Sequence, residues 1–155
     1  MTPRLEFQFV STNGVRLHVA RSQGNHGRLV ILLHGFPEFW YGWRHQIPAL
    51  AEAGFRVWAP DQRGYNLSDK PARVASYGLD ELANDMIGLI DAVGKSRAAV
   101  VSHNWGGAVA WWVALRHPER IERLVILNVP HPAVMHRHLR RSLTQLLKSW
   151  FFQLP

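Results

Sequence analysis

The chain of 155 residues contains no cysteine, and it contains no acidic residue after Glu122. The lack of cysteine excludes a disulfide framework and a zinc site built on thiolates. A chain of this length buries enough surface to be stable without either. Because 47% of its residues are hydrophobic and only 19% are charged, the composition predicts one compact globular domain rather than a disordered segment.

Most of the net charge of +7 comes from the C-terminal part of the chain, which has basic residues but no acidic ones. A basic cluster can mark a surface that binds nucleic acid or an anionic membrane. Arg137, His138, Arg140 and Arg141 nevertheless lack interleaved aromatic residues and any recognised binding motif, which such surfaces usually have. We therefore expect a solvated basic face and no nucleic-acid partner.

The sequence predicts neither a leader nor a membrane span. Met1–Glu6 lacks the apolar core and small-residue cleavage site of a signal peptide. The uncharged stretch Ala98–Leu115 is long enough to cross a membrane, but polar residues and glycines between positions 102 and 107 interrupt it. We interpret this stretch as a strand, a turn and a buried helix, and we expect a cytoplasmic location without membrane contact.

Apolar periodicity predicts strands that alternate with helices. Alternating residues on either side of Asn13-Gly14 predict an antiparallel hairpin, because a two-residue turn needs positive φ at both central positions. Apolar runs and helical spacing predict further strands over 29–33, 55–59, 98–101 and 124–127, and helices over 46–53, 79–93 and 105–116. This order is typical of an α/β fold with a mostly parallel sheet and helices on both faces.

Two loops that follow predicted strands contain the residues suited to chemistry, and ligands usually bind at such strand ends. The first loop is His34-Gly35-Phe36-Pro37, and the second is Ser102-His103-Asn104-Trp105-Gly106-Gly107. Small residues two before and two after position 104 form the pattern of a nucleophile elbow. The sharp turn would raise residue 104 above the sheet, where the amides of Trp105 and Phe36 would stabilise an oxyanion.

The sequence resembles the epoxide hydrolases of the α/β-hydrolase superfamily over nearly its whole length. The haloalkane dehalogenases rank second, because they usually have Asn where this chain has Phe36. A dinucleotide-binding reductase ranks third, since the first loop lacks a Gly-x-Gly-x-x-Gly motif. Besides the elbow, the resemblance rests on His34–Trp40, Trp43–Gln46, Asp61–Tyr65 with Ser68–Pro71, Tyr77–Leu82 and Asn128–Pro132.

The resemblance implies a mechanism in which an aspartate at position 104 attacks an epoxide carbon and forms an alkyl-enzyme ester. A histidine-activated water then hydrolyses the ester. It also implies that Phe36 and Trp105 supply the oxyanion amides, and that a cis bond before Pro37 shapes the first loop. The expected substrate is a small apolar epoxide, and no cofactor is expected.

Two departures from this family affect the expected activity. The first departure is that position 104 is Asn. A neutral amide lacks the anionic oxygen needed for attack on the epoxide. The bulk of Trp105 also disfavours backbone-assisted deamidation of Asn104 to Asp.

The second departure is that the family's catalytic acid and histidine follow a cap domain and do not occur before Pro155. The resemblance therefore implies that residues 1–136 form the N-terminal part of the core and that 137–155 begin the cap. We predict that the chain alone is inactive, with a non-catalytic, truncated hydrolase-like binding protein as the alternative.

The other histidines are not expected to be catalytic or to bind a metal. On a sharp elbow the side chains of neighbouring residues diverge, so we expect His103 to be packed or hydrogen-bonded near the loop. No carboxylate lies near His131, His136 and His138 in the sequence to complete a ligand set. We therefore predict no metal site.

The aromatic residues and the last strand complete the predictions. Trp111 and Trp112 are expected to pack in the core or at an interface, whereas Trp40 and Tyr41 would either line a pocket or support the first loop.

In the family, two later strands cover the strand 124–127. Without them an apolar edge is open, which predicts self-association of this chain.

Overall fold

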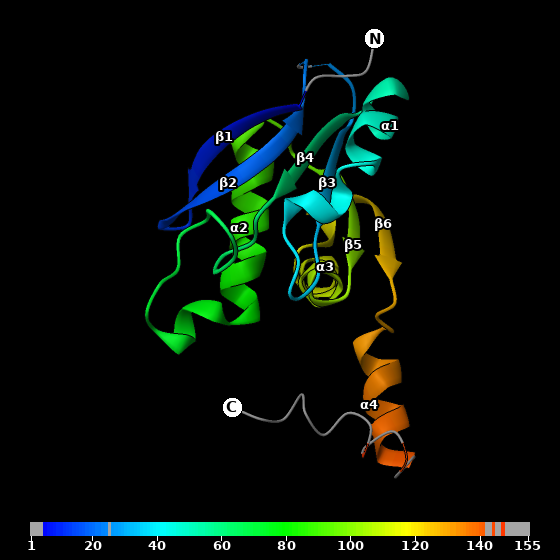
Figure 1. The fold of residues 1–155 in the computed structure, drawn as a ribbon. Helices are drawn as coiled ribbons and strands as arrows, with labels where there is room; N and C mark the ends of the chain where they lie inside the picture. Colours follow the sequence, from blue (N-terminus) through cyan, green and yellow to red (C-terminus); the bar gives the residue numbers. More distant parts are fainter. Residues whose placement is uncertain (1–4, 25, 142–143, 145–146, 148–155) are drawn as a thin grey trace.

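A six-stranded sheet with the strand order β1-β2-β4-β3-β5-β6 organises the molecule (Figure 1). The structure is a computed structural model that describes residues 5–24, 26–141, 144 and 147. The first two strands, β1 (Leu5–Thr12) and β2 (Val15–Ser22), form the predicted hairpin. At its turn Asn13 has a φ of 44° and Gly14 a φ of 74°, so both residues adopt the positive φ that the turn requires.

The remaining four strands are parallel to one another, as predicted. They are β3 (Leu29–Leu33), β4 (Arg56–Pro60), β5 (Ala98–His103) and β6 (Ile121–Leu127). All five residues of β3 are buried, which confirms the interpretation of its unbroken apolar run. β5 extends two residues beyond the prediction, because Ser102 and His103 pair with β6. The polar Ser102 is accommodated there since its hydroxyl donates to the carbonyl of Val125 at 3.2 Å.

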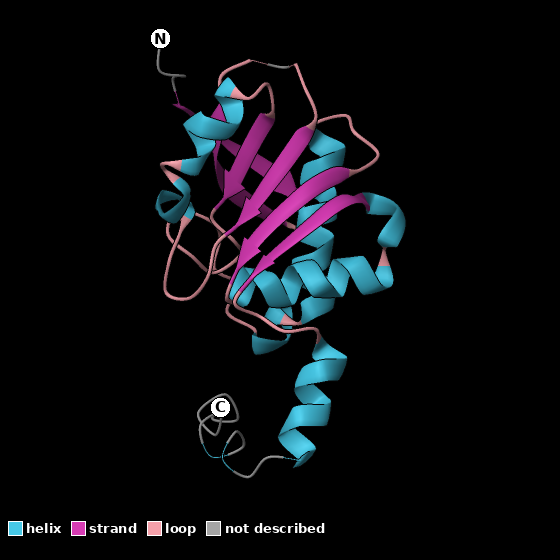
Figure 2. Cartoon of the chain, turned by 90° about the vertical axis from the view of Figure 1, so that its right-hand side faces the viewer, coloured by secondary structure: helices cyan, strands magenta, loops and turns pink. Residues whose placement is uncertain are grey.

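Helices cover both faces of the sheet, which confirms the predicted layers (Figure 2). On one face α2 (Leu79–Ala92) and α3 (Trp105–Arg116) pack against a core that includes Ile31, Met86 and Val109. On the other face α1 (Gln46–Glu52) packs Ile47 into a smaller core. Single turns of 3₁₀ helix occur at Trp40–Trp43, Val74–Tyr77 and Pro118–Arg120.

Strand β6 forms one edge of the sheet. Leu124 and Ile126 pack against the larger core, whereas Val125 is 46% exposed and Leu127 is 44% exposed. In the described part of the chain β6 is therefore an apolar edge strand, as predicted, and self-association stays a prediction.

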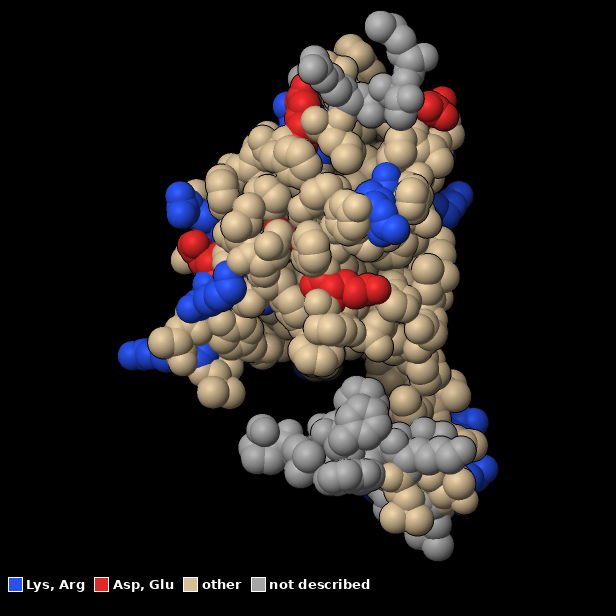
Figure 3. All heavy atoms as spheres, viewed as in Figure 1, with Lys and Arg blue, Asp and Glu red and all other residues tan. Residues whose placement is uncertain are grey.

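Helix α4 (Pro132–Arg141) projects from the body of the molecule, and none of its residues is buried (Figure 1). Basic side chains gather at its end (Figure 3). The predicted boundary between the core and the cap, at residues 136 and 137, falls within this helix. That boundary stays a prediction. The cap-like stretch 148–155 lies outside the described residues. In the part of the chain that the structure describes, no helix is long and apolar enough to span a membrane.

Candidate active site

Asn104 occupies a sharp turn between β5 and α3, with a φ of 49° and a ψ of −120°. A residue other than glycine reaches this conformation only when its surroundings enforce it. The backbone N–H of Asn104 donates to the carbonyl of Leu127 at 3.2 Å, and its carbonyl accepts from the N–H of Gly107 at 2.8 Å. The loop therefore has the geometry of the elbow that the sequence pattern predicts.

Two glycines allow the elbow and the first loop to approach closely. A Cβ added at Gly106 would lie 2.5 Å from the carbonyl oxygen of Leu33, and one added at Gly35 would lie 2.6 Å from the Cβ of Asn104. Both distances are shorter than van der Waals contact, so a side chain at either position would push the two loops apart. The small residues thus bring β3, the first loop and the start of α3 together.

The two amides predicted to form an oxyanion site lie beside residue 104. The backbone N–H of Phe36 donates to Oδ1 of Asn104 at 3.1 Å. The amide of Trp105 opens α3 and has no hydrogen-bond partner among the described residues. The Phe36–Pro37 peptide is cis, as the resemblance implies. The arrangement can hold one oxygen of a residue-104 side chain on a backbone donor.

A cleft of about 410 Å³ lies next to these amides. Trp40 and Tyr41 do not line it. The backbone N–H of Trp40 donates to Asp61 at 2.9 Å, and its ring packs edge-on against Phe7 with the centroids 5.0 Å apart. These contacts join Trp40 to β1 and to the segment after β4, while lining of a substrate pocket by Trp40 and Tyr41 stays a prediction. The residues that line the cleft are Phe36, Arg63, Gly64, Tyr65, Tyr77, Leu82 and Trp105.

His34 fixes the base of the first loop and is completely buried. Its Nδ1 donates to the carbonyl of Gly35 at 2.9 Å, and its Nε2 accepts from the N–H of Gln62 at 2.9 Å. The side chain of Gln62 in turn donates to the carbonyl of His34 at 2.7 Å. Burial lowers the pKa of His34, and an imidazole that accepts a hydrogen bond at Nε2 is neutral. His34 therefore joins the loops after β3 and β4.

His103 is hydrogen-bonded, as predicted, and its partners lie in two other loops. Its Nδ1 lies 3.1 Å from Oε2 of Glu38, and its Nε2 lies 3.0 Å from Nδ2 of Asn128. Glu38 also accepts from the N–H of Gly35 at 3.3 Å. These bonds hold the His103 side chain between two loops. Glu38 and Asn128 both belong to the motifs of the resemblance, but the sequence pattern assigns neither of them a role.

Asp61 anchors the segment after β4 and is completely buried. Its Oδ2 lies 2.8 Å from Nδ1 of His18 and accepts from the side-chain amide of Asn66 at 2.8 Å. Its Oδ1 accepts from the backbone of Trp40. A single carboxylate therefore connects β2, the segment after β4 and the 3₁₀ turn after the first loop. Sequence reasoning missed this role, because the partners are far apart along the chain.

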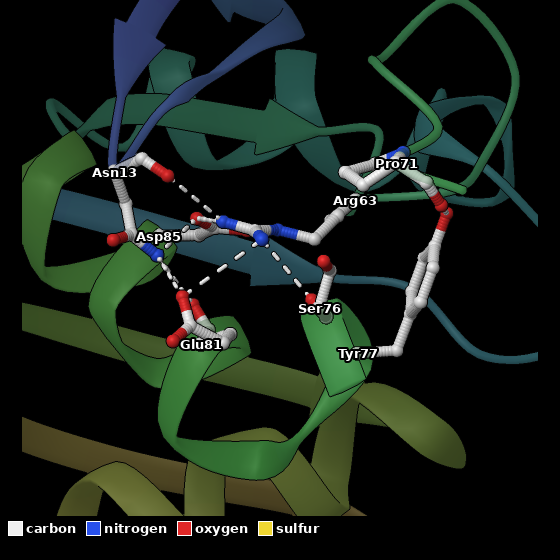
Figure 4. Close-up of polar contacts among 7 residues, drawn as sticks. All are labelled: Asn13, Arg63, Pro71, Ser76, Tyr77, Glu81 and Asp85. Carbon is white, nitrogen blue, oxygen red and sulfur yellow. Dashed lines mark hydrogen bonds and ion pairs between the residues drawn. The ribbon is translucent and has the colours of Figure 1, made fainter. Parts of the chain in front are cut away.

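Arg63 lies at the edge of the cleft and is buried with Asp85 of α2 (Figure 4). Besides Asp85, its guanidinium donates to the carbonyls of Ser76 at 3.0 Å and Asn13 at 3.1 Å. The hydrogen bonds to Asp85 raise the pKa of Arg63. Tyr77, next to Ser76, donates from its hydroxyl to the carbonyl of Pro71 at 2.9 Å. The cluster ties the hairpin turn to α2 and to the wall of the cleft.

The remaining predicted residues lie away from the elbow side chain. Trp111 donates from Nε1 to the carbonyl of Val129 at 3.3 Å and packs edge-on against His131. Trp112 packs against the larger core and donates to Asp80 at 2.7 Å. Both tryptophans are thus packing residues, as predicted. Within the described ranges, no three His, Asp or Glu side chains are grouped so that they could hold a metal ion.

The fold and the sharp elbow together define the architecture of an α/β-hydrolase. A family model described as the alpha/beta hydrolase fold matches residues 28–154. The chain therefore belongs to the α/β-hydrolase fold family, and within that family it is epoxide hydrolase-like.

Particular relatives show how much of such a protein the chain represents. The AB hydrolase superfamily protein YfhM of Bacillus subtilis is 54% identical over 151 residues, which cover 96% of this chain and 53% of that protein. Epoxide hydrolase A of Mycobacterium tuberculosis is 49% identical over 123 residues, which cover 79% of this chain and 38% of that protein. The chain thus spans about half or less of the length of these relatives.

The chain likewise covers half or less of the solved structures that it matches. A crystal structure of a mutant epoxide hydrolase from Bacillus megaterium, with its diol product, has a TM-score of 0.87 and 39% identity. The match covers 94% of this chain and 50% of that protein. Epoxide hydrolase A from Mycobacterium thermoresistibile has a TM-score of 0.82 and 42% identity. The match covers 95% of this chain and 44% of that protein.

Proposed function

We propose that this chain is the N-terminal part of an epoxide hydrolase-type core, in which position 104 is the site of the alkyl-enzyme ester. The proposal is supported above all by the 3.1 Å hydrogen bond from the Phe36 amide to Oδ1 of Asn104. An aspartate in the same place would keep one oxygen on this donor and present the other to an epoxide carbon. The Phe36 and Trp105 amides would then carry the negative charge that develops when the ester is hydrolysed.

The proposed substrate is a small apolar epoxide that occupies the cleft beside Phe36 and Trp105. The cleft is lined mainly by aromatic and aliphatic side chains, which favour an apolar ligand. The relatives that bear the name epoxide hydrolase support this substrate class.

We also propose that the chain has no turnover while residue 104 is Asn. A neutral amide is a poor nucleophile. Among the described residues, the Asn104 side chain is hydrogen-bonded only to the Phe36 amide. In the described part of the chain, no histidine or carboxylate side chain is hydrogen-bonded to Asn104, and His103 is hydrogen-bonded to Glu38 and Asn128 instead.

The test is a fusion of this chain to the C-terminal remainder of the Bacillus subtilis relative, made with Asn104 and with Asn104→Asp. Styrene oxide serves as the substrate, and diol is measured by chromatography. We expect diol from the Asn104→Asp fusion only, together with an alkyl adduct on the peptide that contains residue 104. The mass of this peptide is checked before each assay, so that any conversion of Asn104 is detected.

A folded but inert Asn104→Asp fusion would contradict the proposal and favour the non-catalytic binding protein. Halide release from a primary chloroalkane, without diol from the epoxide, would favour a haloalkane dehalogenase-type enzyme instead. Circular dichroism compared with the intact Bacillus subtilis relative shows whether the fusion has folded.

A further inference from the structure

The backbone of Asn104 brings its side chain over the next peptide nitrogen. When an L-residue is viewed along its Cα–C bond, its Cβ and its own backbone nitrogen are a third of a turn apart. At the observed ψ of −120°, the Cβ of Asn104 therefore eclipses the nitrogen of Trp105. Closure of a five-membered ring requires that alignment. The ring would contain Cα, Cβ, Cγ and the main-chain carbonyl carbon of Asn104, together with the nitrogen of Trp105. An unfolded chain rarely populates it at a non-glycine residue with a φ of 49°.

The groups around the Asn104 side chain also favour closure of such a ring. The Phe36 amide donates to Oδ1 at 3.1 Å and so withdraws electron density from Cγ. The Trp105 amide is at the first position of α3 and has no hydrogen-bond partner among the described residues, so no bond has to break before it reacts. Trp105 is 38% exposed and Asn104 is partly exposed, so the two residues lie at the surface of the molecule.

We propose that Asn104 and Trp105 form a site of self-modification. The Trp105 nitrogen attacks Cγ of Asn104 and closes a succinimide ring. The N–Cγ bond forms, the Cγ–Nδ2 bond breaks, the Trp105 amide proton passes to water, and Nδ2 takes a proton from water and leaves as ammonia. No oxidant or cofactor is needed.

Water then opens the ring in one of two ways. Attack at Cγ breaks its bond to the Trp105 nitrogen, restores the normal peptide and leaves aspartate at position 104. Attack at the main-chain carbonyl leaves isoaspartate. Because the Phe36 donor acts on the oxygen attached to Cγ, aspartate is the major product.

The fold reverses what the sequence favours at this site. In a flexible chain the bulk of Trp105 disfavours cyclisation, whereas the folded elbow holds the Asn104 backbone at the ψ that ring closure requires before the reaction begins. The inference concerns the chemistry of residue 104 and does not rest on the proposed function.

The experiment compares Asn104 in the folded chain and in guanidinium chloride, at the same mildly alkaline pH, by mass-spectrometric peptide mapping. We expect conversion at least about tenfold faster in the folded chain, an intermediate that has lost ammonia, and cleavage by hydroxylamine between residues 104 and 105. Asn66 and Asn128, which also have positive φ, are comparators in the same digest. They should convert more slowly in the folded chain than in denaturant.

The variant Asn104→Gln is the matched control, because its longer side chain would need a less favourable six-membered ring. It should remain unconverted under the same conditions. Slower conversion of Asn104 in the folded chain than in denaturant, or none at all, would overturn the proposal. So would conversion to aspartate without the ammonia-loss species and without hydroxylamine cleavage, since that result indicates direct attack by water.

Discussion

Arg63 donates two parallel hydrogen bonds to Asp85, from Nε to Oδ2 at 2.8 Å and from Nη2 to Oδ1 at 2.6 Å. Both residues are buried, each only 4% exposed. The planar guanidinium fits a carboxylate in this arrangement, which an ammonium group could not reproduce. The pair joins the segment after β4 to α2 and thereby fixes one wall of the cleft beside Phe36 and Trp105.

Asp85→Ala should strongly destabilise the chain, because it leaves the Arg63 charge buried without its partner. We expect the free energy of unfolding to fall by about 3–5 kcal/mol, measured by denaturant titration. Arg16→Ala is the control, since it removes the exposed pair Arg16–Asp69 and should cost less than about 1 kcal/mol. Equal losses for the two variants would contradict the assigned role of the buried pair.

The burial of His34 predicts a dependence of stability on pH. Burial lowers the pKa of His34 in the folded chain, whereas the unfolded chain has the ordinary value of about 6.5. The unfolded state therefore takes up the proton first as the pH falls. The contribution of His34 to stability is complete above about pH 6.5 and is lost as the pH falls through the folded pKa.

Denaturant titrations at a series of pH values test the assignment to His34. The variant His34→Gln should lose part of the fall in unfolding free energy below about pH 6.5. His45→Gln, at an exposed position, should leave the slope unchanged. Parallel curves for the parent chain and His34→Gln would show that this histidine does not cause the pH dependence.

Gly106→Ala tests the close approach of α3 to the end of β3. The added Cβ would lie 2.5 Å from the carbonyl oxygen of Leu33, and the backbone must move to make room. We expect a loss of about 1–3 kcal/mol in unfolding free energy. Gly42→Ala is the matched variant, because its Cβ would meet only the side chain of Glu38 at 3.6 Å. Its stability should stay close to that of the parent.

The edge strand β6 makes self-association of the 155-residue chain testable by light scattering. Val125 and Leu127 are exposed on a strand whose outer edge is unpaired in the described part of the chain. We expect the scattering mass to rise with concentration, and Val125→Lys to reduce this rise, because a charge disfavours pairing of edges. Val134→Lys, on the exposed helix α4, is the control. A monomeric parent chain at all concentrations would refute the prediction.

Local patterns were sufficient to predict most of the elements and the loop pattern of the site. Asn13-Gly14 specifies its turn because few residues tolerate positive φ, and the unbroken run 29–33 specifies a buried strand. The small residues around Asn104 indicate a tight elbow for the same steric reason. The end of β5 and the start of β6 could not be predicted, since pairing between the two strands determines them.

The sequence by itself determined the α/β order, the absence of thiol chemistry and the unusual Asn at position 104. Only the tertiary structure decided which distant residues meet. Phe36 and Asn104 are 68 positions apart, and Arg63 and Asp85 are 22 apart. Such contacts depend on how strands and helices pack, which local periodicity does not encode. The ψ of Asn104 is likewise imposed by the packed elbow, because an isolated Asn-Trp segment has no interactions that would hold this strained conformation.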